Sequence, residues 1–186
     1  MTFTKKILPD FIEVSGVCYK INTDFQYFIL FLQKLKNKVS DLKEYDFMYA
    51  SRTPRNRLLG FNQLKSFTYP EKPLPRNPRA VSDEILLDYE LDAELIYSAF
   101  YKEYKIDLFD ENLHLHWYKF QALLSGLQET KLNQIMKIRS YKPSQNDSPQ
   151  YRKEMREQYE IWHIEPELSQ EEKLEIERFD ALLNQK

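Results

Sequence analysis

The sequence has few glycines and no long apolar segment. Its 186 residues include three glycines, Gly16, Gly60 and Gly126, which lie far apart. Walker-type phosphate loops and dinucleotide-binding fingerprints both need several closely spaced glycines, so neither kind of site can be drawn. The longest apolar run covers residues 27–32. A membrane-spanning helix needs about 20 apolar residues, so this run predicts a core helix and no membrane association.

Cysteine is also scarce. A single residue, Cys18, cannot form an internal disulfide or a thiolate metal cluster. A free thiol in a chain of this size is typical of a reducing compartment. Lys5 and Lys6 are not followed by an apolar signal core, because Pro9 and Asp10 interrupt the segment. These features lead us to expect an intracellular protein.

The candidate catalytic and metal-binding residues do not form a known pattern. His114 and His116 are two residues apart, and residues at that spacing do not share a helix face. The acidic run 88–94 lacks the central glycine of a calcium loop, and it is better explained by the positive end of the helix that follows. Cys18 lies in a β-prone run, so we expect a packed thiol, and no G-x-S-x-G elbow is present. We therefore expect a non-enzyme without a cofactor or metal.

Charge is segregated along the chain. The formal net charge is -2, from 27 basic and 29 acidic residues. Residues 51–80 hold seven bases and one acid, a local +6, whereas residues 81–112 hold two bases and ten acids, a local -8. The basic segment could fold over the acidic one, or it could bind an acidic partner or a phosphate backbone. The internal or solvated interpretation is favoured, because charged runs usually keep a surface hydrated.

Periodicity and capping signals predict a mainly α fold, a helical domain of about five or six helices with a small N-terminal β-hairpin. A single domain over residues 1–147 is expected to contain the hairpin at 10–21, a helix at 24–38 capped by Thr23, a Pro/Arg-rich loop at 51–80 and a helical core at 83–142. In that core, Asn112 is the expected N-cap of a helix, and Trp117 and Phe120 are expected to be buried.

A helical arm is predicted over residues 148–186. Ser148 and Pro149 form an N-cap followed by proline at the first helical position, and Ser169 with Glu172 opens a final helix. Large apolar side chains recur along the first helix of the arm at Tyr151, Met155, Tyr159 and Trp162. Aromatic residues dominate binding energy at protein interfaces, so these four are candidate partner-binding residues. The candidate basic residues of the loop are Arg52, Arg55, Arg57, Arg76 and Arg79.

Three stretches resemble the bacteriophage gene-product-fifteen family, which is encoded in tail-gene clusters of phages and prophages of Gram-positive bacteria. They are the hairpin and helix start at 14–25, the segment 92–108, and the run Leu115-His116-Trp117-Tyr118-Lys119-Phe120 continuing to Arg139. The third run is the most specific. Segments 40–82 and the residues after 165 resemble the family least.

The resemblance implies a role in tail morphogenesis in the host bacterial cytoplasm. Proteins encoded between the major tail protein and the tape-measure protein look like tail assembly chaperones, which keep the helical tape measure soluble until the tube polymerises around it. The expected partners are the tape measure or other tail proteins, with homo-oligomerisation left open. The family supplies no catalytic residues. One alternative is nucleic-acid binding through residues 52–79, where aromatic side chains accompany the bases, and another is a structural tail component.

Overall fold

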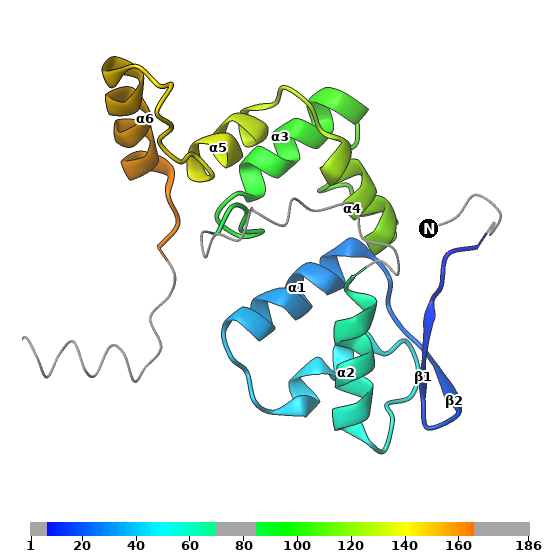
Figure 1. The fold of residues 1–186 in the computed structure, drawn as a ribbon. Helices are drawn as coiled ribbons and strands as arrows, with labels where there is room; N and C mark the ends of the chain where they lie inside the picture. The colour runs from blue at the N-terminus through cyan, green and yellow to red at the C-terminus, as the bar shows by residue number, and fades with distance from the viewer. Residues whose placement is uncertain (1–6, 70–84, 166–186) are drawn as a thin grey trace, which may run out of the picture. The chain divides into compact units, whose positions relative to one another are not determined.

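A computed structural model describes residues 7–69 and 85–165 of the chain (Figure 1). Contacts group these residues in two units. Unit 1 holds the described residues 7–69 and 88–134, and unit 2 holds 85–87 and 135–165. The predicted final helix at Ser169, and the basic residues Arg76 and Arg79, lie outside the described residues.

The fold is mainly helical with an N-terminal hairpin, which confirms the predicted fold class. Within the described ranges, the chain forms two strands, one 3-10 helix and six α-helices. In chain order these are β1 (Phe11–Val14), β2 (Val17–Lys20), α1 (Phe25–Lys36), η1 (Leu42–Met48), α2 (Arg57–Phe67), α3 (Ala93–Tyr104), α4 (Trp117–Gly126), α5 (Lys131–Arg139) and α6 (Pro149–Trp162). Helix α5 begins in unit 1 and ends in unit 2.

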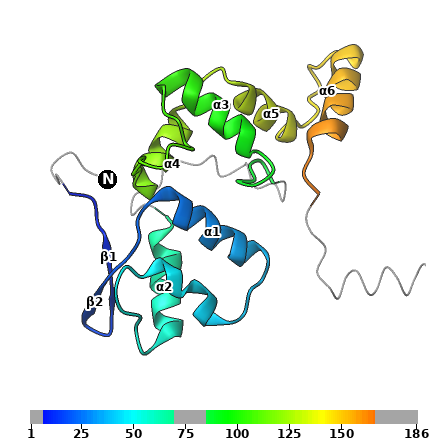
Figure 2. The ribbon, with the colours of Figure 1, turned by 180° about the vertical axis from the view of Figure 1, so that it is seen from behind.

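The hairpin turns at Ser15 and Gly16, whose φ angles of 54° and 77° are those of a primed two-residue turn. Ile12 and Val14 are buried on one face of β1, which packs beside α2 (Figure 2). Cys18 pairs with Glu13 on the opposite, solvent-facing side. The expectation of a packed thiol is therefore wrong, because strand alternation places residue 18 outward.

Helix α2 corrects the prediction of a continuous loop over residues 51–80. The side chain of Asn56 accepts a hydrogen bond from the Leu59 N–H at 3.0 Å and caps the helix. Gly60 lies inside α2, where an added Cβ would meet the hydroxyl of Tyr49 and Cγ of Pro54. Glycine therefore permits the close approach of the helix to the preceding segment, at the cost of helix propensity.

Two predicted N-caps are also wrong. The Asp24 side chain, not that of Thr23, accepts from the Gln26 N–H at the start of α1, while the Thr23 carbonyl accepts from the Trp117 N–H at 2.7 Å. Helix α4 is capped by His116, not by Asn112. The segment before His116 is held instead by Asp24, whose carboxylate accepts from the Leu115 N–H. These long-range bonds override the local capping signals.

The core of unit 1 is built around stacked aromatic rings. Trp117 is 1% exposed, and its ring stacks with those of Phe28 and Phe120 at centroid distances of 5.2 and 5.8 Å. Its indole N–H donates to the carbonyl of Thr68 at 3.0 Å, which satisfies the one polar atom of the side chain. Both residues predicted to be core, Trp117 and Phe120, are confirmed.

Candidate partner-binding surface

Helix α6 carries the four residues that sequence spacing selected as partner-binding. It begins as predicted: Ser148 Oγ accepts from the Tyr151 N–H at 3.2 Å, and Pro149 occupies the first turn. No residue of this 14-residue helix is buried. A helix without a fully buried residue keeps part of its apolar surface accessible to another molecule.

The four side chains form a partly covered stripe, which we call the α6 stripe (Tyr151, Met155, Tyr159 and Trp162). Tyr151 is 46% exposed, and the other three are half-buried. The ring of Tyr151 meets that of Tyr141 edge-on at 5.8 Å. The ring of Tyr159 stacks on His163 at 5.4 Å. The stripe is therefore oriented by its own neighbours in unit 2 while part of its surface stays in solvent.

Arg139 holds the C-terminal end of α6. Its side chain is buried, Nε donates to the carbonyl of Trp162 at 2.7 Å, and Nη1 donates to the carbonyl of Leu86 at 3.1 Å. The last carbonyls of a helix carry partial negative charge, so a guanidinium is well placed there. Sequence reasoning did not identify this role, because no local spacing relates residue 139 to residues 86 and 162.

The polar segment between α5 and α6 is fixed by Asp147. Its carboxylate accepts from the Ser144 N–H at 2.8 Å and from the Tyr141 hydroxyl at 2.7 Å, and these two bonds hold its pKa below the usual range. Desolvation and the hydrogen bond to Asp147 together raise the pKa of Tyr141. Arg152 adds a bond from Nη2 to the carbonyl of Ser144 at 2.9 Å. Hydrogen bonds thus fix the segment before α6 as well as the C-terminal end of the helix.

The basic candidates in the described ranges do not form one cluster. Arg57 makes a two-pronged pair with Asp46, with Nη2 to Oδ2 at 2.9 Å and Nε to Oδ1 at 3.1 Å. Arg52 lies over the ring of Tyr19, 5.3 Å from its centroid, and Arg55 is exposed. Arg57 is therefore paired with η1 and, among the described residues, not with the acidic segment from residue 85 to 112.

The aromatic side chains of the same segment mostly serve the core. Phe67 is buried and stacks on Phe28 at 5.5 Å, and Phe61 packs against Tyr45 at 4.9 Å. Bases of a nucleic acid stack on exposed rings. Of the rings of Phe61, Phe67 and Tyr69, that of Tyr69 alone is exposed.

The acidic run before α3 organises the helix start. Asp88 accepts from the backbone N–H groups of Glu90 and Leu91 at 2.9 and 3.0 Å, and its Oδ2 lies 3.0 Å from Nζ of Lys36. Burial alone would raise the pKa of Asp88, but these hydrogen bonds and the Lys36 charge outweigh it and lower the pKa. Asp92 accepts from the Asp88 N–H at 3.0 Å and stands at the N-cap position of α3.

The two histidines before α4 lie in different surroundings. The His114 side chain is 91% exposed, whereas His116 is half-buried and hydrogen-bonded. Among residues 7–69 and 85–165, no three His, Cys, Asp or Glu side chains are grouped so that they could hold a metal ion. None of the helices in the described ranges combines the length and apolarity needed to cross a membrane.

Comparison with known proteins decides the family. The model of the family described as Bacteriophage Gp15 protein matches residues 61–164, more than half of the chain. The chain belongs to this bacteriophage protein family. No curated protein and no solved structure gives a match.

The match to the Gp15 family runs from within α2 to the residue pair after α6. It includes the whole α6 stripe, together with Arg139 and Asp147 that fix the ends of the helix. Arg52, Arg55 and Arg57 lie before the matched range. The matched range thus includes α6 and the residues that support it, together with α3, α4 and α5.

Proposed function

We propose that this phage protein is a non-enzymatic tail assembly chaperone that binds the tape-measure protein in the host bacterial cytoplasm during tail morphogenesis. The observation that carries the proposal is the α6 stripe, an apolar surface on a helix with no buried residue, within a chain of the Gp15 family. Its aromatic members match the residue types that dominate protein interfaces. The link to the tape measure comes from the family resemblance.

The geometry suits a helical client. An amphipathic helix buries its apolar face in a surface whose side chains recur at helical spacing, so two apolar stripes can interdigitate. Tyr151, Met155, Tyr159 and Trp162 lie along one side of α6, because they are separated by four, four and three residues. Met155 adds a flexible apolar side chain, which tolerates varied clients. Binding would cover the parts of the stripe that are now exposed.

The experiment is co-purification from phage-producing cells with a tagged full-length chain. Wild-type chain is expected to retain the tape-measure protein. The double variant Y159A/W162A should lose at least about nine-tenths of it, because truncation of aromatic hot spots typically costs about 2 kcal/mol or more each. The far-UV circular dichroism of the variant should match that of the wild type, since neither residue is buried.

A matched control removes two exposed aromatic side chains elsewhere. The variant F11A/Y69A, altered in β1 and after α2, should retain the tape measure as the wild type does. Unchanged retention by Y159A/W162A would contradict the proposal. Mass spectrometry of purified particles separates the alternative of a structural tail component, because a chaperone is expected to be missing from finished virions.

A further inference from the structure

Unit 1 carries an exposed aromatic cluster that is separate from α6. Tyr97 and Tyr101 lie on α3, one turn apart, and their rings stack at 6.0 Å. Phe109, in the loop after α3, lies 5.0 Å from Tyr97. Tyr101 is 51% exposed and Phe109 is 75% exposed. We call these three residues the α3 aromatic patch. Single exposed apolar residues are ordinary, but three touching rings form a continuous surface.

The loop that presents Phe109 is fixed by hydrogen bonds. The carboxylate of Asp107 accepts from the Phe109 N–H at 2.9 Å, and its backbone carbonyl accepts from the Asp110 N–H at 3.2 Å. Leu108, between them, is buried. Lys105 ends α3 in the left-handed conformation, with φ of 57°. Phe109 is therefore held in solvent by its neighbours, and little conformational entropy would be lost when a partner covers it.

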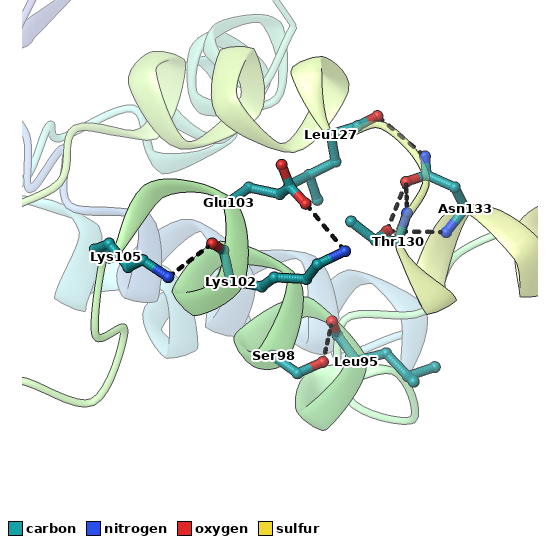
Figure 3. Close-up of polar contacts among 8 residues, drawn as sticks. All are labelled: Leu95, Ser98, Lys102, Glu103, Lys105, Leu127, Thr130 and Asn133. Carbon is teal, nitrogen blue, oxygen red and sulfur yellow. Dashed lines mark hydrogen bonds and ion pairs between the residues drawn. The ribbon is translucent and has the colours of Figure 1, made fainter.

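The charge around the patch is negative. Asp107, Asp110 and Glu111 are exposed within five residues of chain that include Phe109. The two lysines at the end of α3 are engaged locally, as Figure 3 shows: Lys102 pairs with Glu103 at 3.4 Å, and Nζ of Lys105 donates to the carbonyl of Lys102 at 3.2 Å. Residues 101–111 hold four acids and two bases, a local charge of -2, so the carboxylates outweigh the lysines and favour a cationic partner.

We infer that the α3 aromatic patch is a docking surface for an amphipathic helix of another protein whose apolar side chains are flanked by lysine or arginine. Tyr101 and Phe109 supply the apolar anchors, and Asp107, Asp110 and Glu111 attract the flanking cations. This surface uses none of the residues of the α6 stripe. A chain with both surfaces can contact two segments of one client, or a client and a second tail protein.

The inference is tested with the full-length chain and two labelled synthetic peptides of about 18 residues, long enough to form a helix in water. One places leucine at helical spacing (i, i+3, i+4, i+7) and lysine at the other positions, and the other replaces every lysine with glutamate. Fluorescence anisotropy should show binding of the leucine–lysine peptide alone, and this binding should weaken with added salt. The variant F109S should weaken it by about tenfold or more, as expected for one aromatic anchor.

Two further variants make the result specific. D110N/E111Q should weaken binding of the leucine–lysine peptide while the aromatic rings remain. The control F11S removes a half-exposed phenylalanine from β1 and should bind the peptide as the wild type does. Circular dichroism should show that all variants keep the helical fold, since each altered side chain is exposed.

Four outcomes would overturn the inference. These are unchanged binding by F109S, equal loss in F11S, equal binding of the leucine–glutamate peptide, or a wild-type dimer that F109S converts to a monomer. The last result would assign the patch to a second copy of this chain. In Y159A/W162A the leucine–lysine peptide should bind as it does to the wild type, which separates the α3 aromatic patch from the α6 stripe.

Discussion

His116 caps α4 with an imidazole, where a hydroxyl or carboxylate is more usual. Its Nδ1 accepts from the Tyr118 N–H at 3.1 Å, so the proton of the neutral ring is assigned to Nε2, which then donates to the carbonyl of Pro9 at 3.0 Å. One ring thus joins the start of α4 to the chain before β1. A second proton on Nδ1 would abolish the cap and place positive charge at a helix N-terminus.

The surroundings of His116 favour the neutral ring. Burial lowers the pKa below its ordinary value of 6.5, the carbonyl of Pro9 raises it, the charge of Lys119 lowers it, and Asp10 and Asp24 raise it. The net direction is downward. Below pH 6.5 the unfolded chain therefore binds more protons at this site than the folded chain, and the free energy of unfolding falls as the pH falls.

The cap predicts a pH-dependent stability that can be measured by urea denaturation. The unfolding midpoint of the wild type should fall between pH 7.5 and pH 5.5. In H116N the midpoint should decrease less over the same pH range. Asparagine accepts the same hydrogen bond from the Tyr118 N–H, but it does not titrate, so the part of the decrease that comes from His116 is absent. H116A should lose about 0.5–2 kcal/mol at pH 7.5 through loss of the cap.

His114 provides the control for this comparison. H114N alters a side chain that is 91% exposed, so its pH dependence should match that of the wild type. Equal pH dependence of H116N and wild type would show that protonation of His116 does not govern the stability of α4.

At the scale of elements, α6 depends on Arg139 for its position in unit 2. R139M removes the donors to the carbonyls of Trp162 and Leu86 while keeping an apolar stem of similar length. A buried carbonyl that loses its donor costs about 1–3 kcal/mol. Hydrogen exchange of the α6 amides should therefore accelerate by about tenfold or more in R139M.

The variant R139K is expected to restore little of this protection. A single ammonium group cannot donate to two carbonyls in the geometry of the planar guanidinium group. The control K137M changes an exposed residue of the same helix and should leave exchange in α6 unchanged. Equal protection of α6 in R139M and wild type would show that the two hydrogen bonds do not hold the helix.

The elements that sequence predicted well are those whose signals are local. Helix α6 is defined by Ser148 and Pro149, and the hairpin by its turn and β-prone runs. Helix α2 was missed because the prolines around it suggested a loop. It is supported by the Asn56 cap, by the pair of Arg57 with Asp46 and by the packing of Gly60 against Tyr49 and Pro54, and the last two join it to the segment before the helix.

At the scale of the whole molecule, the α6 stripe could be selected from spacing alone, because four apolar residues recur at three- and four-residue intervals. The groups that fix the stripe could not, since Arg139 reaches carbonyls 53 and 23 residues away. The α3 aromatic patch was missed for the same reason. Phe109 belongs to no periodic pattern, and its exposure depends on Asp107 and on the buried neighbour Leu108.

The charge segregation seen in the sequence has a partial counterpart in the structure. Lys36 of α1 pairs with Asp88 at the start of the acidic approach to α3. Arg57 pairs with Asp46. Asp107, Asp110 and Glu111 remain exposed at the surface. They are the part of the acidic segment 81–112 to which we assign a binding role. The near-zero net charge therefore conceals a local acidic surface around Phe109.

The two tryptophans give the chain a built-in spectroscopic reporter for each unit. Trp117 is enclosed by aromatic rings in unit 1, whereas Trp162 is half-buried at the end of α6 in unit 2. Emission of W162F should therefore report unit 1 alone and lie at shorter wavelength than emission of W117F. Client binding at the α6 stripe should shift the spectrum of W117F toward the blue and leave that of W162F unchanged. Loss of either unit during denaturation can be followed in the same way, without an added label.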